Sequence, residues 1–229
     1  MQHEELRRQL CVDSENHCRH CFVGKPTARS QCPPNTFRTS LLRGEKPIAF
    51  VFDKPNDNTQ YRTSSIVPID TFDDRAGVDN GLARAPSHAR LLALCKLLNL
   101  IDSDSQSVDI SNIHITNAVK CDVSSETGLS GRVVVGRDQA DACIKNFLLR
   151  ELEACNTKGV IFFGVNAAKY VLGIETKAWV LERRLIGSRQ YWVMRVPHTS
   201  PESYNTHGKN GQAYIEPFKR LLAAVATDA

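Results

Sequence analysis

Polar side chains that could take part in catalysis or binding follow three stretches that have the pattern of buried strands. Asp53 follows the apolar run 47–52, Asn117 ends the run 113–116, and His198 comes just after the run 190–196. The carboxyl ends of parallel strands meet at one edge of an open sheet, where ligands bind. A carboxylate, an amide and an imidazole at that edge can position water and donate or accept hydrogen bonds. The alternative is that each residue only caps a turn or lies in a solvent-exposed loop.

The eight cysteines are the second informative feature. The beginning of the chain is charged and has no apolar signal region, so we expect a cytoplasmic protein whose thiols stay reduced. Metal binding or catalysis is then a better explanation for the cysteines than a disulfide framework. Cys18 and Cys21 form a pair of the type found in zinc sites, iron–sulfur sites and redox motifs.

Length and composition favour one main domain. The chain has 229 residues, of which 41% are hydrophobic, and no apolar run is long enough to span a membrane. We divide it into a cysteine-rich N-terminal segment, 1–46, and an α/β domain, 47–229. The net charge of +4 is modest, but basic residues cluster at Arg38–Lys46, Arg183–Arg189 and Lys219–Arg220. These clusters fit either nucleic-acid binding or ordinary solvated faces.

Strand and helix patterns alternate along the α/β domain. Strands are predicted at 47–52, 108–116 and 160–164, and a hairpin at 179–185 and 190–196 supplies a fourth sheet strand through its second arm. Helices are predicted from Pro86, and over 137–155, 166–173 and 214–226. This order predicts a three-layer α/β/α sandwich around a mainly parallel four-stranded sheet. The loops after Phe52, Thr116 and Val196 should converge on one edge.

The motifs in this order resemble the uracil-DNA glycosylase superfamily, most closely its iron–sulfur branch. Phe52-Asp53-Lys54-Pro55-Asn56 stands where the branch has its water-activating loop, and Thr116–Cys121 is similar to its Thr-Asn-Val-Val-Lys-Cys motif. Phe163–Ala168 looks like the strand-to-helix turn of the family. His198-Thr199-Ser200-Pro201 is similar to the His-Pro-Ser-Pro loop.

The resemblance also implies a 4Fe-4S cluster that packs the N-terminal segment on the core. The branch has a Cys-x-x-Cys pair, a third cysteine just after the Asn motif and a fourth on the next helix. The matching residues are Cys18, Cys21, Cys121 and Cys143. The gap between the last two is longer than in the branch, so Cys11 and Cys32 are rival ligands, and zinc is a rival metal.

The resemblance assigns catalytic roles to three residues. Asn117 would read the edge of a flipped pyrimidine, and His198 would donate a hydrogen bond to the base as negative charge develops on it. Asp53, with Asp57 as the rival, would position the attacking water. The remaining expected substrate contacts are Phe52, Lys54, Pro55, Asn56, Asp57, Lys120, Ser200, Pro201 and Tyr204, with Tyr204 as the wedge in the gap left by the base. Lys120, Arg183, Arg184 and Arg189 would contact phosphates.

Two departures from the family pattern affect the base pocket. Lys54 replaces a small residue in the first loop, and the segment before the first helix lacks the aromatic on which uracil stacks, so Phe52 or Phe72 would have to substitute. We therefore expect a monomeric DNA glycosylase for a modified pyrimidine, such as those installed by bacteriophages. The alternatives are an ordinary uracil-DNA glycosylase of base excision repair, a non-catalytic DNA-binding iron–sulfur protein and a zinc-stabilised regulatory module.

Overall fold

The computed structural model describes residues 46–53, 72–73, 86–100, 107–108, 113–119, 136–200 and 202–228. At its centre is a five-stranded sheet with the order β4-β1-β5-β7-β6. The strands are β1 (Ile48–Phe52), β4 (Ile113–Asn117), β5 (Gly159–Phe163), β6 (Leu181–Ile186) and β7 (Arg189–Val196). Neighbouring strands from β4 to β7 pair in parallel, and β6 pairs antiparallel with β7. The mainly parallel sheet is confirmed, but it has one strand more than expected because both arms of the hairpin join it.

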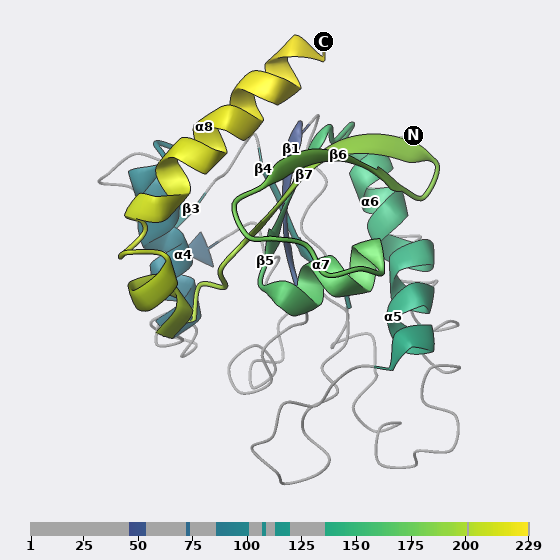
Figure 1. Ribbon diagram of the computed structural model, residues 1–229, viewed down its shortest axis with the longest axis horizontal. Helices are drawn as coiled ribbons and strands as arrows, with labels where there is room; N and C mark the ends of the chain where they lie inside the picture. Colours follow the sequence, from purple (N-terminus) through teal and green to yellow (C-terminus); the bar gives the residue numbers. More distant parts are fainter. Residues whose placement is uncertain are drawn as a thin grey trace, which may run out of the picture.

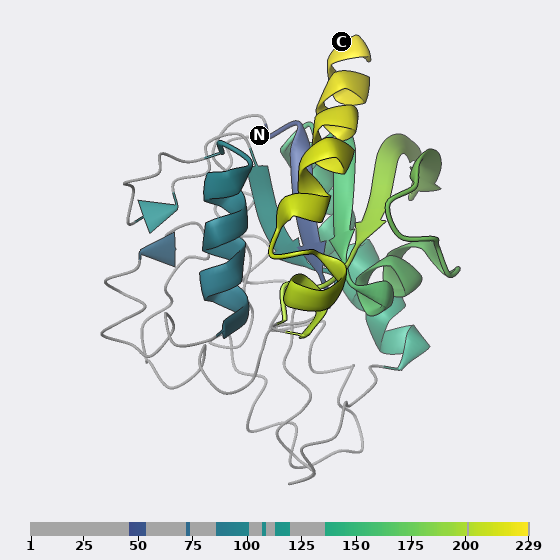
Figure 2. The ribbon, with the colours of Figure 1, turned by 60° about the vertical axis from the view of Figure 1, so that its left-hand side comes forward.

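Helices cover both faces of this sheet, as Figures 1 and 2 show. One face packs against α4 (Pro86–Leu97) and α8 (Gln212–Thr227), and the other against α5 (Arg137–Cys143), α6 (Leu149–Ala154) and α7 (Val165–Leu172). Successive side chains of a strand point to opposite faces. Phe50 accordingly packs in the α4/α8 core, and Val51 in the core under α5 to α7. The expected three-layer sandwich is confirmed.

Two π-helical segments lie between regular elements, one between α5 and α6 and one between β7 and α8. Ile144–Leu148 joins α5 to α6, so that a helix close to the predicted range 137–155 runs across the sheet. Ser203–His207 lies between the end of β7 and α8. Helix α7 ends, as expected, at a glycine: Gly173 has φ 72° and caps the helix in the left-handed conformation that a Cβ disfavours.

The predicted strand 108–116 is wrong in its first half. β3 (Ser107–Val108) pairs antiparallel with β2 (Phe72–Asp73) in a separate two-stranded sheet, and β4 begins only at Ile113. The pattern of β-branched residues predicted one continuous strand because it continues through a change of sheet.

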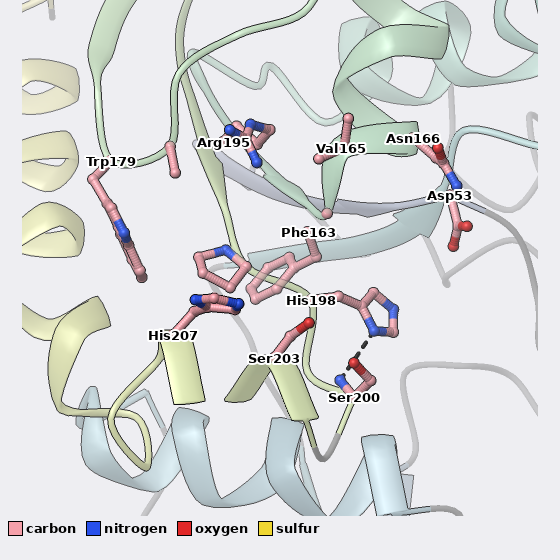
Figure 3. Close-up of a pocket in the computed structure, with 13 residues that line it drawn as sticks. Asp53, Phe163, Val165, Asn166, Trp179, Arg195, His198, Ser200, Ser203 and His207 are labelled. Atoms are coloured by element: carbon pink, nitrogen blue, oxygen red, sulfur yellow. Dashed lines mark hydrogen bonds between the residues drawn. The ribbon is translucent and has the colours of Figure 1, made fainter. Parts of the chain in front are cut away.

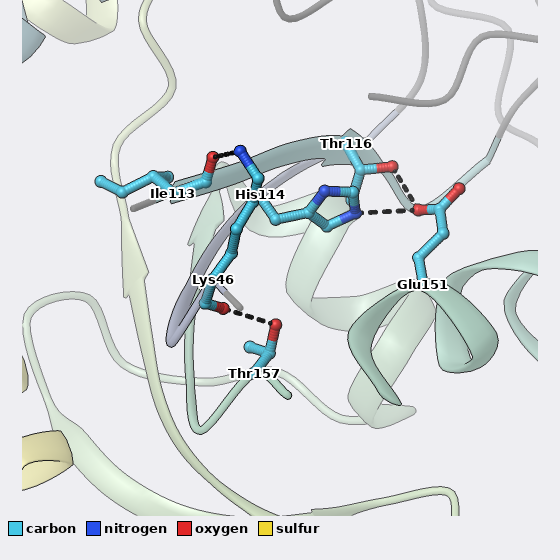
Figure 4. A network of polar contacts seen from close by, with 6 residues as sticks. All are labelled: Lys46, Ile113, His114, Thr116, Glu151 and Thr157. Carbon is cyan, nitrogen blue, oxygen red and sulfur yellow. Dashed lines mark hydrogen bonds and ion pairs between the residues drawn. The ribbon is translucent and has the colours of Figure 1, made fainter. Parts of the chain in front are cut away.

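A fully buried polar network connects β4 to α6 (Figure 4). The Thr116 hydroxyl donates to Glu151 Oε2 at 2.7 Å, and His114 Nε2 lies 3.2 Å from the same oxygen. All three residues have no exposed surface. A carboxylate inside a core requires such partners, because burying it without them costs about 3 kcal/mol. The network therefore fixes β4 against α6 directly before Asn117.

The helices of the described segments are all too short or too polar to cross a membrane.

Candidate active site

Four parallel strands end at the same edge of the sheet. The register places Phe52 of β1 beside Asn117 of β4, and Phe163 of β5 beside Val196 of β7. The chain leaves this edge as Asp53, as Gly164 and as Pro197-His198, so the expected convergence of the strand ends is confirmed.

A cavity of about 610 Å³ lies along this edge (Figure 3). Asp53 lies at one end of it, and Trp179 at the other, with His198 between them. The complete lining within the described residues is Asp53, Phe163, Gly164, Val165, Asn166, Ala178, Trp179, Arg195, Pro197, His198, Ser200, Ser203 and His207. The cavity thus joins the ends of β1, β5 and β7 with the connection from α7 to β6 and the segment after β7.

The loop that carries His198 is held by three hydrogen bonds. The Gly164 N–H donates to the Val196 carbonyl at 2.8 Å, and the Tyr214 hydroxyl of α8 donates to the Pro197 carbonyl at 3.0 Å. Burial raises the pKa of Tyr214, which keeps this donor protonated. The third bond runs from the Ser200 N–H to His198 Nδ1 at 3.0 Å. The imidazole therefore occupies a defined position over the cavity.

The bond from Ser200 also decides the tautomer of His198. A backbone N–H can only donate, so Nδ1 accepts and the proton of the neutral ring is on Nε2. Burial lowers the pKa of His198, and the nearby Asp53 charge opposes this shift in part. The ring is thus held neutral near pH 7, with Nε2–H as a donor.

Gly164 supplies the backbone conformation of the strand-to-helix turn beside His198. Its φ of 96° is one that side chains rarely adopt, whereas a Cβ there would make only an ordinary van der Waals contact, 3.5 Å from the His198 Cβ. The backbone conformation is therefore the reason for a glycine in the Phe163–Ala168 motif.

An aromatic layer separates the cavity from the core. Phe52 stacks on Phe163 with ring centroids 4.6 Å apart, and meets the His198 ring edge-on at 5.7 Å. Asn117, the neighbour of Phe52 in the register, is buried to 7% exposure and lies outside the cavity lining. Phe52 is thus placed between Asn117 and His198 at this edge of the sheet.

The Asp53 backbone is fixed although its side chain lines the cavity. The Val119 N–H donates to the Asp53 carbonyl at 2.9 Å, and the Ala118 N–H donates to that of Phe52 at 2.7 Å, which extends the contact between β1 and β4 past Asn117. Asp53 and His198 face one cavity and interact electrostatically. A carboxylate and an imidazole donor on either side of an open space can activate water and stabilise a leaving anion.

The model of the Uracil DNA glycosylase superfamily matches residues 12–222. The chain belongs to this superfamily. A search of curated proteins finds no match. Members of the uracil DNA glycosylase superfamily are generally hydrolases that remove bases from DNA, so DNA is the indicated partner and base excision the indicated reaction.

Several of the residues to which the superfamily motifs gave roles lie outside the described part of the chain. They are Lys54, Pro55, Asn56, Asp57, Lys120, Cys18, Cys21, Cys121 and Pro201. Their roles stay predictions. Cys143, the remaining predicted cluster ligand, is buried at the end of α5 in the same core cluster as Val119. Among described residues, no group of three or more potential metal ligands occurs.

The structure places Tyr204, the predicted DNA wedge, in the core and outside the cavity lining. Its side chain is only 6% exposed, and its ring stacks on Tyr214 in the α4/α8 core at a centroid distance of 6.0 Å. A packed aromatic cannot enter the base stack without opening that core. Its neighbour Ser203 lines the cavity instead, and Ser200 lines it as predicted.

The arginines of the predicted basic cluster, Arg183, Arg184 and Arg189, do not line the cavity. Arg184 and Arg189 lie near the turn, at the opposite end of β7 from His198. Each arginine of this cluster has an acidic partner: Arg183 pairs with Asp228, Arg184 with Glu182 at 2.7 Å, and Arg189 with Glu153 at 3.3 Å. The phosphate contacts predicted for this cluster stay predictions. Lys46 is not part of a basic surface, because it is buried with Nζ 3.5 Å from the Ile113 carbonyl.

Sequence reasoning missed Trp179, Arg195 and His207 in the cavity wall. Arg195 gives one usable signal, since it is a charged residue inside an apolar strand pattern, three positions before His198. Trp179 was taken as the first residue of a strand, but β6 begins at Leu181 and Trp179 has φ 67° in the preceding turn. No sequence signal places His207 at the cavity, because its position depends on the π-helical segment.

Proposed function

We propose that this protein hydrolyses the N-glycosidic bond of a modified pyrimidine in DNA and leaves an abasic site. The observation that carries the proposal is the His198 imidazole, held as the Nε2–H tautomer beside Asp53 in the cavity at the sheet edge. The finer choice of a modified base is supported by Lys54 and by the altered aromatic position in the sequence.

The chemistry follows from where charge develops. As the bond between base and sugar lengthens, the base gains negative charge and the sugar gains positive charge, as in other glycoside cleavages. His198 Nε2–H would donate to the base oxygen, in a partly water-excluded site where such a bond is strongest. Asp53 would stabilise the sugar cation and orient the water that attacks it. Proton and bond balance are complete: water supplies OH to the sugar and a proton to the departing base.

Base recognition would use the neighbouring part of the same edge. Phe52 offers a ring face beside Asn117, whose amide supplies both an acceptor and a donor. An amide of this kind can pair with either a uracil-type or a cytosine-type edge, depending on its orientation. A modified pyrimidine of the kind installed by bacteriophages is therefore a compatible substrate, and its removal would serve antiviral defence.

A strand-cleavage assay tests this function. The purified full-length protein is incubated with DNA containing uracil, with DNA containing modified pyrimidines and with unmodified DNA, and abasic sites are then converted to breaks by alkali. We expect breaks in the modified DNA. Breaks in the uracil strand alone would establish an ordinary uracil-DNA glycosylase, and binding without breaks in any DNA would establish a non-catalytic binding protein.

Asp53→Asn provides the matched test of the water-positioning role. The substitution keeps the shape but removes the negative charge, and we expect a rate loss of roughly 10²–10⁴-fold with DNA binding retained. Asp141→Asn is the control, because Asp141 is half exposed and, among the described residues, pairs with Arg137 one helical turn away. Equal rates for both variants would assign the water to another group, with Asp57 as the first candidate.

We also propose that Cys18, Cys21, Cys121 and Cys143 hold a 4Fe-4S cluster that fastens the N-terminal segment to the core. Cys143 supports this, because it packs in the same core cluster as Val119, two residues before Cys121, and a π-helical segment of the kind often found at functional sites begins just after it. Burial raises the pKa of two further core thiols, Cys95 and Cys155, to about 12, as expected for inert core cysteines.

Metal analysis and an absorbance scan separate the candidates. We expect iron, sulfide and a broad visible band in the purified protein, lost in Cys143→Ser and kept in Cys95→Ser. Zinc without a visible band would replace the cluster by a zinc site. Iron retained in Cys143→Ser would reassign this ligand to Cys11 or Cys32.

A further inference from the structure

The half of the cavity beyond His198 has a composition of its own. Across the sheet edge the order is Asn117, Asp53, Gly164 and His198, and then Trp179 beside the start of β6. The reacting bond of the proposed function lies between Asp53 and His198. The portion that follows, lined by Trp179, Arg195, Ser203 and His207, therefore lies past the reacting bond, on the side away from Asn117.

Trp179 is held in an unusual backbone conformation on this wall. Its φ of 67° is a genuine outlier for a bulky residue and is unfavourable unless the surroundings hold it. The surroundings maintain it: the Trp179 N–H donates to the Arg195 carbonyl at 2.9 Å, and its carbonyl accepts from Arg220 of α8 at 3.1 Å. The indole meets the Tyr214 ring edge-on at 5.0 Å. These contacts fix the indole at the end of the cavity (Figure 3).

Arg195 lies next to this indole and is positioned by the same connection. Its Nε–H donates to the Thr176 carbonyl at 2.7 Å, and residue 178 forms a parallel bridge with residue 195. A guanidinium has five N–H donors, so this bond uses one and orients the rest. Unlike Arg183, Arg184 and Arg189, Arg195 lines the cavity and has no carboxylate partner within the described residues.

We infer that Trp179, Arg195 and His207 form a subsite for the nucleotide that flanks the excised base. The planar base of that nucleotide stacks on the indole, and its phosphate binds the Arg195 guanidinium with His207 at the rim. Stacking of a base on an aromatic side chain and a phosphate on arginine are the usual elements of single-strand recognition. The total volume of about 610 Å³ is in the range of drug-sized ligands and accommodates more than one pyrimidine ring. The subsite rests on the proposed function for its orientation, since the reacting bond defines which nucleotide is the flanking one.

The two tryptophans of the chain permit a test that does not depend on cleavage. Trp192 is half-buried on β7, outside the cavity lining, with the Arg183 guanidinium 5.1 Å from its ring. In Trp192→Phe the remaining indole is Trp179, so its fluorescence reports directly on the subsite. We expect quenching by a short single-stranded oligonucleotide in this variant and no such response in Trp179→Phe.

Kinetics then locate the stacked base. In DNA substrates the nucleotide on either side of the target is replaced, one at a time, by an alkali-stable abasic analogue that keeps the phosphate. We expect one of the two replacements to lower kcat/KM about tenfold or more for the wild type and for Trp192→Phe, which is the size of one base–aromatic contact. Trp179→Ala should show no further loss with that substrate. Arg195→Gln should reduce the salt dependence of binding by about one phosphate contact.

The outcomes separate this inference from the proposed function. Quenching without any cleavage would support the subsite and overturn the proposed function. Cleavage with no quenching of Trp179 and no effect of either abasic flank would overturn the subsite and leave the proposed function intact. A response that follows only the substituent on the target base would also overturn it, because the wall would then bind the excised base itself. Far-UV circular dichroism of Trp179→Ala checks folding, and the Trp179→Phe and Arg195→Gln measurements do not depend on that variant.

Discussion

The described residues include two pairs of a histidine and an acidic residue, and their surroundings differ completely. His114 and Glu151 lie fully buried between β4 and α6, with Thr116 sharing the same carboxylate oxygen. His198 and Asp53 face a cavity at the sheet edge, and the imidazole is bonded to a backbone N–H rather than to the carboxylate. The first pair satisfies its own hydrogen-bonding groups. The second leaves a donor and a carboxylate for a ligand.

This difference shows that residue type does not identify a functional site. A polar group whose partners all come from the protein stabilises the fold, whereas one held by the backbone with a donor directed at a cavity can act on a substrate. Substitutions in the two pairs should therefore separate activity from stability.

Beside Asp53→Asn, the largest expected effect is on the rate of the His198→Ala variant. Removal of one preorganised donor to a developing anion costs roughly 10²–10³-fold in rate. The free energy of unfolding should change little, because the ring lies at a cavity and its loop keeps the bonds from Gly164 and Tyr214. Single-turnover base release and a denaturant titration measure the two quantities. A fully active variant would remove His198 from the mechanism.

The next largest effect is on stability and belongs to Glu151→Ala. The substitution leaves His114 and Thr116 without this acceptor inside the core, so we expect a loss of roughly 3 kcal/mol in the free energy of unfolding. Glu153→Ala on the same helix is the control. Glu153 is 63% exposed and pairs with Arg189 at 3.3 Å, so its removal should cost less than about 1 kcal/mol.

Equal stability losses in these two variants would contradict a structural role for the buried network. A rate loss in Glu151→Ala at full stability would instead mean that the network acts on the site through Thr116 and Asn117, which are adjacent in β4.

The sequence was sufficient for the layers and for the convergence of the strand ends. Apolar runs such as 48–52 and 159–163 are buried on both faces, so their pattern predicts parallel strands independently of distant contacts. Asp53 and His198 could be placed because they directly follow such runs. The resemblance to the superfamily supplied their roles.

The differences between prediction and structure come from features that tertiary packing decides. Tyr204 occurs in a polar stretch that looks exposed, but the π-helical segment turns its ring toward Tyr214 and the core. Tryptophan is common in strands, but Trp179 lies before β6 and is held at positive φ by its hydrogen bonds with Arg195 and Arg220. Arg183, Arg184 and Arg189 lie together in the sequence as a basic cluster. Their ion pairs with Asp228, Glu182 and Glu153 depend on contacts that no local pattern contains.

The smallest expected effect is the pH dependence that His198 gives to the rate and to the stability. Burial lowers the pKa of His198 below its ordinary value of 6.5, and the Asp53 charge reduces this shift. The unfolded chain therefore binds the proton first on acidification, so the stabilisation by the neutral ring is present above pH 6.5 and is lost as the pH falls through the folded-state pKa. Protonation of Nδ1 also breaks the bond from the Ser200 N–H that orients the ring. We expect a flat rate above pH 6.5 and an acid limb below it, with a small parallel loss of stability that is absent in His198→Ala. Rates and melting temperatures measured across this pH range test whether the neutral ring is the active form. A rate that rises on acidification would mean that the charged imidazolium is the active form.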